Sequence, residues 1–466
     1  MVNIPSGLSG NPANNTVIGD GAGNALTTGS ANIIIGHDAG AAMTNVANSV
    51  VIGVDAYKNN SAGYVTAIGH QAGVNGAGQF STFVGASAGF SSSANYQVAI
   101  GYEAQNSGAG GTGSVAVGRT ANKSNTADYA VSIGYEAGYS NTSGLSNTNV
   151  GYKAGYQNTT NANRTYMGYE AGNYNSGANN TGIGYRACNG YYSFGTGQGT
   201  GADNTGLGYE AMSSLNGASA IKNTAVGVQC LGGVLTAGEN TAIGYQAGRA
   251  ITSGEENTIM GSSAADDLTT GSRNIVIGQG AMIVNTDGND NVVVGHDALP
   301  AETGGDRNVA IGAQALNAQN QTFASQNVAV GYAADDGNLT GNFRVCIGGQ
   351  AGHSSATGTN VINIGYNSNE GSSSAANVVT LGNSDIATLR CQVTSITALS
   401  DERDKTSIED LPYGLDFINS LQPKKFVWDN REETDKYGNT YTSSRKGAKD
   451  IGFIAQELQS VDDDFL

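Results

Sequence analysis

A short motif, in which an apolar residue is followed by glycine, recurs along most of this chain. One complete copy is Asn240–Gly248, with the sequence NTAIGYQAG. Its first glycine, which we call the marker glycine, returns at 22 positions that are 16 or 17 residues apart, except for one step of 24 and two of 19. The marker glycines are residues 19, 36, 53, 69, 85, 101, 118, 134, 151, 168, 184, 208, 227, 244, 261, 278, 295, 312, 331, 348, 365 and 382. A fixed period of this kind is the sequence signature of a repeat architecture.

The residues just before each marker glycine predict a short strand. An apolar residue precedes the glycine directly, and Thr, Val or Ile stands three residues before it. Two stiff side chains that are two residues apart lie on the same face of a strand. We therefore expect this pair to face the core. The residue between them then points outward, although it is often apolar, as at Ile34, Phe83 and Val293.

Small and polar positions complete each repeat. Ala stands three residues after the marker glycine in 19 of the 22 copies, which indicates that another stretch of backbone passes close by. Asn stands four residues before it in 12 copies and suits turns and stacked ladders. Each repeat thus predicts a strand, a glycine turn, a return segment and a second turn. Stacked, the repeats predict an all-β protein, a parallel β-solenoid (β-roll) of about 22 coils and roughly 100 Å in length at ~4.8 Å per coil.

A single solenoid of this kind buries little apolar surface. Fixing the backbone of one 17-residue coil costs on the order of 17–34 kcal/mol. Two or three buried aliphatic side chains return only about 1.5–3 kcal/mol each. An apolar outer stripe is a natural contact between identical chains, so we expect a homo-oligomer and interpret it as a homotrimer. The energetic argument favours association without setting the number of chains.

The composition changes after the last repeat. We divide the chain into a lead-in at 1–15, the solenoid shaft at 16–383, connecting strands at 384–399 and a second domain at 400–466. Charged residues number 24 in residues 400–466 and 35 in all the residues before them. The second domain therefore has the composition of an ordinary small α+β domain.

The pattern inside the second domain predicts both helices and strands. A helix is expected at Tyr413–Leu421, where Pro423 stops it. Strands are expected at Lys424–Trp428 and Asp450–Ile454, with a polar loop between them. A further helix is expected to begin at Ala455.

Charge and cysteine usage exclude several classes of function. The formal net charge is −17, which argues against nucleic acid or an anionic membrane as partner. No apolar run approaches 18 residues, and the first 30 residues lack the pattern of a secretory signal. The four cysteines show no CxxC spacing, so no disulfide framework is expected. The histidines lie on distant repeats, and we expect neither a metal site nor a cofactor.

The charged segment that begins at Ser400 holds the strongest candidate for chemistry. A serine with Lys405 nearby can act as nucleophile and base if burial lowers the pKa of the lysine. The same serine can equally cap a helix beside solvated charges. Both interpretations stay open on chemistry alone.

Three motifs in this part of the chain resemble the C-terminal intramolecular chaperone of phage tail fibres and tailspikes, the self-cleaving endosialidase-type family. The motifs are Ser400–Ile408 (SDERDKTSI), Gly414–Pro423 (GLDFINSLQP) and Gly452–Leu458 (GFIAQEL). The resemblance implies a chaperone that trimerises the fibre ahead of it and then cuts itself off. Members of this family usually continue into a further helical stretch, so we expect this copy to be truncated at its C-terminal end.

The resemblance also implies roles for individual residues. The bond between Leu399 and Ser400 would be cleaved, with Ser400 and Lys405 as the catalytic pair. Asp401 and Arg403 would support the conformation of the motif. Any enzymatic activity would then be at most a single self-cleavage by a Ser/Lys endopeptidase.

Taken together, these features predict a trimeric phage tail fibre that is assembled in the host cytoplasm and acts in the virion. Its partners would be a tail or baseplate protein and a bacterial surface receptor, in particular a glycan. A loop in the 24-residue step carries Tyr191, Tyr192 and Phe194, which are candidates for receptor binding. Tyr follows the marker glycine in nine copies, either as a row that stacks on glycan rings or as an aromatic ladder.

Other classes of protein remain open. The repeats, for example Asn308–Gly312, also resemble the β-roll heads of trimeric autotransporter adhesins. A bacterial surface adhesin is therefore one alternative, and an ice-binding solenoid is another. A tailspike enzyme that degrades surface polysaccharide is a further alternative, although the repeats offer no distinctive acidic pair.

Overall fold

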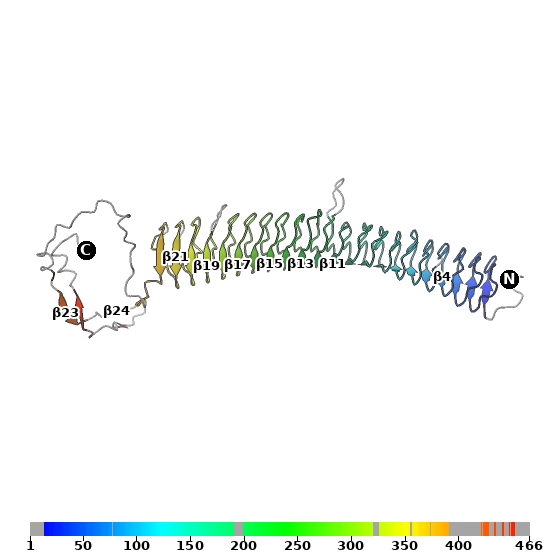
Figure 1. Cartoon of the computed structure of the whole chain (residues 1–466), viewed down its shortest axis with the longest axis horizontal. Helices are drawn as coiled ribbons and strands as arrows, with labels where there is room; N and C mark the ends of the chain where they lie inside the picture. The colour runs from blue at the N-terminus through cyan, green and yellow to red at the C-terminus, as the bar shows by residue number, and fades with distance from the viewer. Residues whose placement is uncertain are drawn as a thin grey trace. The chain divides into compact units, whose positions relative to one another are not determined.

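We describe the protein from a computed structural model (Figure 1). It describes residues 14–390, apart from 77, 191–198, 320–325, 355–356 and 373, together with 421, 423–427, 433–434, 440–441, 447 and 449–452. The chain divides into two compact units, Met1–Thr388 and Leu389–Leu466, which we treat separately.

The described part of the first unit is a parallel β-solenoid, as the repeats predict, with one short strand in each coil (Figure 1). The strands are β1 (Thr16–Ile18), β2 (Ile33–Ile35), β3 (Val50–Ile52), β4 (Thr66–Ile68), β5 (Thr82–Val84), β6 (Val98–Ile100), β7 (Val115–Val117), β8 (Val131–Ile133), β9 (Thr148–Val150), β10 (Thr165–Met167), β11 (Thr181–Ile183), β12 (Thr205–Leu207), β13 (Thr224–Val226), β14 (Thr241–Ile243), β15 (Thr258–Met260), β16 (Ile275–Ile277), β17 (Val292–Val294), β18 (Val309–Ile311), β19 (Val328–Val330), β20 (Val345–Ile347), β21 (Val361–Ile364) and β22 (Val378–Leu381). Each strand ends directly before a marker glycine.

Successive strands pair in parallel and in the register that the marker glycines predict. Thr241 of β14, for example, lies opposite Thr224 of β13 and Thr258 of β15. The same residue-for-residue pairing runs from β1 to β22. Equivalent positions of all coils therefore form straight rows along the shaft.

The assignment of strand faces from the sequence is wrong. In β2–β21 the middle residue of the triplet is the buried one, and Ile34, Phe83 and Val293 are 0–1% exposed. The two flanking residues, expected in the core, point outward. The physical reason is the width of the coil: the strand faces Ala residues of the return segment, such as Ala39 and Ala298, which are fully buried. This narrow interior accepts one strand side chain per coil and leaves no room for two β-branched ones.

The asparagines before the strands form a buried ladder, as expected. Nine successive coils carry Asn at this position, and all nine side chains are buried. The Asn274 side chain accepts the backbone N–H of Asn291 at 3.0 Å and donates to the Gly288 carbonyl at 2.8 Å. Its own N–H donates to Asn257 at 3.0 Å. The ladder thus provides hydrogen-bond partners for the backbone N–H and carbonyl groups of the turn, which the strand pairing does not satisfy. Its members are Asn180, Asn204, Asn223, Asn240, Asn257, Asn274, Asn291, Asn308 and Asn327.

Replacing Asn274 with Ala is expected to cost about 2–4 kcal/mol of stability. The change leaves a buried N–H and a buried carbonyl without partners, at about 1–3 kcal/mol each. Denaturant unfolding followed by circular dichroism measures the loss. Asn24→Ala at an exposed position of the first coil is the control, expected to stay within about 0.5 kcal/mol of wild type. Equal losses in the two variants would contradict a specific role for the ladder.

The interior of the solenoid is not uniformly apolar. One hydrophobic cluster ends near Ala121 and a second begins near Ala154. Between them the core position of the strand holds Ser132 and Asn149, and the Ser132 hydroxyl lies 2.7 Å from the Asn122 side-chain oxygen. Polar groups that must be satisfied locally replace apolar contacts in this stretch, so we expect it to open before the flanking coils.

In the second unit, the described residues form two small antiparallel pairs. Strand β23 (Lys424–Val427) pairs with β26 (Lys449–Gly452), and β24 (Glu433–Thr434) pairs with β25 (Thr440–Tyr441). Both predicted strands of this domain are thereby found, and the polar loop between them contains an unpredicted hairpin. The predicted helix at Tyr413–Leu421 and the helix start at Ala455 lie outside the described residues, except for Leu421.

Candidate functional site

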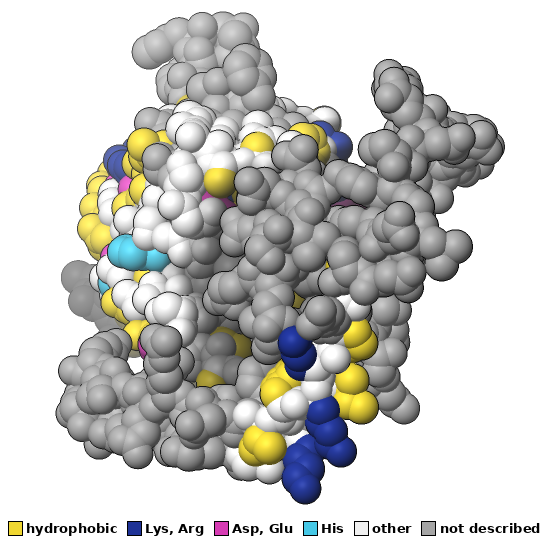
Figure 2. Space-filling model, turned by 90° about the vertical axis from the view of Figure 1, so that its left-hand side faces the viewer, with side chains coloured by type: hydrophobic (Ala, Val, Ile, Leu, Met, Phe, Trp, Pro, Cys, Tyr) yellow, Lys and Arg dark blue, Asp and Glu magenta, His cyan; other side chains and the backbone are white. Residues whose placement is uncertain are grey.

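The broadest feature of the shaft is an uncharged outer face of its sheet. Each of the 22 strands places two residues on this face, and none of them is charged. The position before the marker glycine is always Ile, Val, Leu or Met, and the other is Thr, Val or Ile. Representative side chains are exposed by 38–44%, namely Ile183, Val226 and Met260. Figure 2 shows the end of the molecule that lies on the left in Figure 1, with some hydrophobic side chains (yellow) among its described residues.

This face continues over the whole stack of coils. A monomer rarely exposes an apolar patch larger than a few hundred Å², and larger patches mark interaction sites. The sequence reasoning found an apolar outer stripe but placed it on the middle residue of each strand. In the structure the stripe lies instead on the two residues that flank the middle one, so it is two rows wide.

A second row of the shaft carries stacked tyrosines directly after the marker glycines. Tyr135, Tyr152, Tyr169, Tyr185 and Tyr209 form a continuous stack with ring centroids 4.8–5.3 Å apart and nearly parallel planes. Because every inner ring is covered on both faces, glycan rings cannot stack on these faces. The aromatic-ladder interpretation is therefore the better one for these five residues.

The tyrosine row also contains a cation. Arg119 stands in the same row between Tyr102 and Tyr135, one coil from each. Its guanidinium carbon lies 5.9 Å from the Tyr102 ring centroid and 5.2 Å from that of Tyr135. It also donates a hydrogen bond of 2.5 Å to the Tyr135 hydroxyl. A guanidinium thus fits between two tyrosines that are two coils apart.

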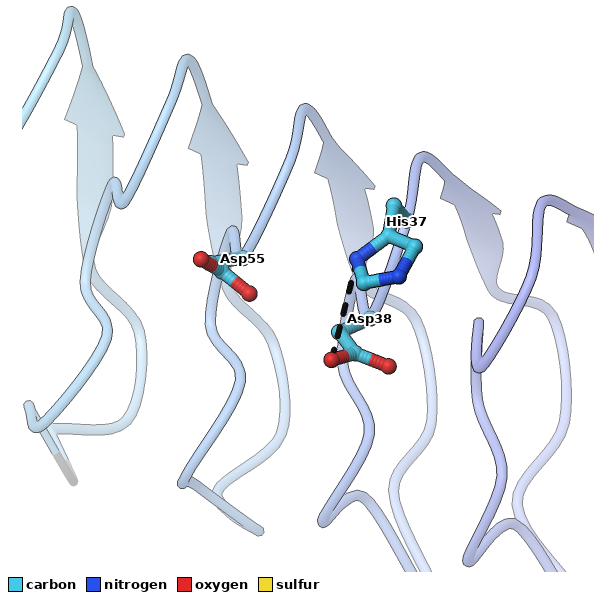
Figure 3. Close-up of side chains that lie close together, drawn as sticks. All are labelled: His37, Asp38 and Asp55. Carbon is cyan, nitrogen blue, oxygen red and sulfur yellow. Dashed lines mark ion pairs between the residues drawn. The ribbon is translucent and has the colours of Figure 1, made fainter.

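Three potential metal ligands converge near the start of the shaft (Figure 3). A ring nitrogen of His37 and carboxylate oxygens of Asp38 and Asp55 lie within 4.8 Å of one another. The ammonium of Lys58, however, lies 2.8 Å from Asp38 and 2.9 Å from Asp55. Its hydrogen bond lowers the pKa of Asp38. Lys58 therefore already supplies the positive charge that these carboxylates require.

A charged cluster that the sequence reasoning missed is buried near the end of the shaft. The Arg344 guanidinium donates to Asp335 at 2.7–3.0 Å and to Glu370 at 3.1 Å, and all three side chains are 0% exposed. Burial by itself would lower the pKa of Arg344, but the hydrogen bonds and charge of Asp335 outweigh it and raise this pKa. The three residues come from three successive coils, so the cluster ties these coils together. One signal was available: Arg replaces Asn at a ladder position.

A surface depression lies over coils 12–14, next to the irregular steps of 24 and 19 residues. Its volume is about 390 Å³, and its lining includes Glu210, Ser213, Gln229, Gly232, Gly233 and Arg249. Glu210 is the one carboxylate of this lining and accepts a 3.0 Å hydrogen bond from Gln229. Glycoside hydrolysis generally requires two carboxyl groups across the bond. This depression therefore lacks the acid–base pair of a polysaccharide-degrading enzyme.

The described cysteines are not candidates for nucleophiles. Cys188, Cys230 and Cys346 are buried and unbridged. Burial raises the pKa of Cys188 and of Cys230 to about 12, so both thiols stay protonated at neutral pH. Cys230 stands where most repeats have Ala and is fully buried.

The residues that the sequence predicts as sites are not among the described residues. This holds for the catalytic pair, the cleavage position and its supporting residues, and for the aromatic loop. They are Ser400, Lys405, Leu399, Asp401, Arg403, Tyr191, Tyr192 and Phe194. Their roles remain predictions.

The described residues contain no helix with the length and apolar character needed to cross a membrane.

Comparison with known proteins identifies the C-terminal part of the chain. Residues 400–466 match the Peptidase S74 family, described as the chaperone of endosialidase. No curated protein and no solved structure matches the chain. The match covers the three motifs singled out in the sequence. The chain thus joins a parallel β-solenoid to a C-terminal chaperone-of-endosialidase domain.

Proposed function

We propose that the chain forms a homotrimeric fibre of the phage tail type, in which the C-terminal domain assembles the solenoid shafts. The observation that carries the proposal is the uncharged sheet face, which runs the length of the shaft in a protein of net charge −17. The chaperone-of-endosialidase match supports it, because the resemblance of this domain implies a trimerising chaperone of fibres and tailspikes.

Energetics favour association through this face. A side chain exposed by about 40% gains roughly 0.6–1.2 kcal/mol when the rest is covered, since full burial is worth about 1.5–3 kcal/mol. Over 22 coils this amounts to on the order of 10–25 kcal/mol per chain. The loss of translational and rotational freedom costs about 4–15 kcal/mol. The free energy gained by covering this sheet face, which we call the seam, therefore exceeds the cost of bringing the chains together.

Light scattering on the purified full chain tests the assembly. The measurement uses the Ser400→Ala variant, which is expected to stay at full length, and the proposal requires a mass of three chains, each of 47.2 kDa. A monomer over the micromolar range would end the proposal. A stable dimer would support association through the sheet face but would contradict the trimer.

A charge on the seam is expected to weaken the assembly. Val226 and Val228 are exposed by 38% and 39%, but Val226 lies on the sheet face and Val228 lies beyond the marker glycine. Val226→Glu places three like charges in the apolar interface of a trimer, and should lower the free energy of dissociation by about 3 kcal/mol or more. Val228→Glu should change it by less than about 1 kcal/mol. Denaturant titration followed by light scattering measures both, and identical midpoints would refute this seam.

Self-cleavage is the second part of the proposal. In it the Ser400 hydroxyl attacks the carbonyl carbon of Leu399 while Lys405 takes up the hydroxyl proton. The bond to the Ser400 nitrogen breaks as that nitrogen receives the proton, and an ester then joins Leu399 to the Ser400 oxygen. Water hydrolyses this ester, which frees the Leu399 carboxylate and restores the Ser400 hydroxyl. Such a step releases the assembly domain after the shaft has formed and leaves a fibre whose stability is kinetic.

Intact-mass spectrometry tests the cleavage. Wild-type protein is expected to release a fragment that begins at Ser400, whereas Ser400→Ala and Lys405→Ala should stay at full length, with at least a hundredfold slower release. Ser407→Ala, in the same motif, is the control and should cleave normally. Release of the fragment from Ser400→Ala would show that another group, or a contaminating protease, cuts the chain.

The proposed place of the protein is the virion, where the free fibre attaches to the bacterial surface. Its partners would be a tail or baseplate protein and a surface glycan, with the loop of Tyr191, Tyr192 and Phe194 as the proposed contact. Binding of the trimer to cells of the host, lost when these three residues are replaced by Ala, would support this assignment. Unchanged binding would remove the loop from it.

A further inference from the structure

At one position of the tyrosine row, a glycine stands between two tyrosines. Tyr332 and Tyr366 belong to coils that are two steps apart, and Gly349 stands between them in the same row. The register is set by the pairing of Val328 with Val345 and of Val345 with Ile362. Each row residue follows its strand residue by four positions, so the three residues are equivalent.

The rings on either side of Gly349 are unusually open. Tyr332 is 60% exposed and Tyr366 is 67% exposed, whereas the stacked tyrosines from Tyr135 to Tyr209 are exposed by 48% or less. A side chain would fit at Gly349. A Cβ added there would meet Cδ2 of Tyr366 at 3.6 Å, an ordinary contact, and the backbone at this residue has no positive φ. A side chain at this position would thus lie against the Tyr366 ring, and glycine leaves the position unfilled.

The same chain shows what fits such a position. Arg119 likewise stands between tyrosines of the preceding and following coils, and its guanidinium carbon lies 5.9 and 5.2 Å from their ring centroids. Coils two steps apart are separated by about 10 Å, so a group midway lies about 5 Å from each ring. That distance is within the ~6 Å range of cation–π contacts.

We propose that Tyr332 and Tyr366 form a binding site for an organic cation, which occupies the position above Gly349 that Arg119 fills in its own coil. The ligand class is a guanidinium or a quaternary ammonium group, and the net charge of −17 favours cations in general. Tyr245 offers no such site, because its row neighbours are Val228 and Ser262 and a second ring is missing. The site goes beyond the proposed fibre function and does not depend on it.

The test is a titration of the full chain with two probes, N-acetyl-arginine amide and choline, followed by ligand-observed NMR. Preference for one probe separates a peptide guanidinium from a choline headgroup as the source. Gly349→Arg is expected to fill the site from within and to weaken binding at least tenfold without loss of secondary structure. Tyr332→Ala should weaken it about two- to fivefold, the contribution of one exposed ring.

The reciprocal variant is the stronger test. Arg119→Gly should open a second site between Tyr102 and Tyr135 and raise the number of bound probes per chain from one to two. Absence of binding by wild type, wild-type affinity in Gly349→Arg, or equal binding of glucose would each overturn the inference. Light scattering on the same samples keeps it apart from the fibre proposal, since a monomer that binds choline would refute the trimer alone.

Discussion

Replacing Gly348 with Ala is expected to lower the stability of the shaft by about 3–5 kcal/mol. Gly348 has φ +131°, a region that L-residues rarely adopt, and the strain amounts to about 1–3 kcal/mol. A Cβ at this position would also lie 2.5 Å from the carbonyl oxygen of Gly365 in the next coil. The coils must separate locally to relieve this overlap, at a further cost of about 1–3 kcal/mol. The midpoint of denaturant unfolding and the rate of limited proteolysis measure the effect.

The adjacent residue provides a matched control. Gly349→Ala adds the same methyl group one residue later, where φ is not positive and the nearest atom lies 3.6 Å away. It should change stability by less than about 0.5 kcal/mol. A Gly348 variant as stable as the Gly349 variant would mean that the marker glycines are not needed for the close approach of coils.

Replacing Arg344 with Asn is expected to cost about 3–5 kcal/mol, even though Asn is the usual residue at this ladder position. The change removes the guanidinium that pairs with the buried carboxylates of Asp335 and Glu370. Burial raises the pKa of Asp335, and Arg344 opposes that rise in the wild type. In the variant the folded pKa therefore lies further above the unfolded one. Stability is then retained below the unfolded pKa and lost as pH rises through the folded pKa, so the deficit should be smaller at pH 5 than at pH 8.

Two controls separate charge burial from a general loss of packing. Arg273→Asn removes an arginine that is 53% exposed and paired with Asp290, and should cost less than about 1 kcal/mol. A triple variant that adds Asp335→Leu and Glu370→Gln to Arg344→Asn should recover most of the loss, since Leu stands at the Asp335 position in other coils. A pH-independent deficit that the triple variant retains would contradict the electrostatic explanation.

The candidate functional surfaces were partly predictable from the sequence. The run of Tyr residues after the marker glycines predicts a row, because a fixed position in every repeat becomes a line along the stack. It does not tell whether ring faces are covered, which depends on side-chain rotamers in neighbouring coils. The buried charged cluster was harder to predict. It combines Asp335, Arg344 and Glu370, which come from three different parts of the repeat, and no periodic rule relates these positions.

The sequence by itself determined the number of coils, their register and the buried asparagine ladder. The reason is steric: at the first twenty marker glycines, φ is near +130° and a carbonyl oxygen lies 2.2–2.6 Å from the would-be Cβ, so no other residue fits there and the glycine marks the turn. Only the tertiary structure decided which strand face is the core. Most strands consist of apolar residues and Thr alone, which carry no contrast between inside and outside. The return segment decides which face is buried. Its alanines leave room for one strand side chain per coil, so the middle residue faces the core and the two flanking residues face solvent.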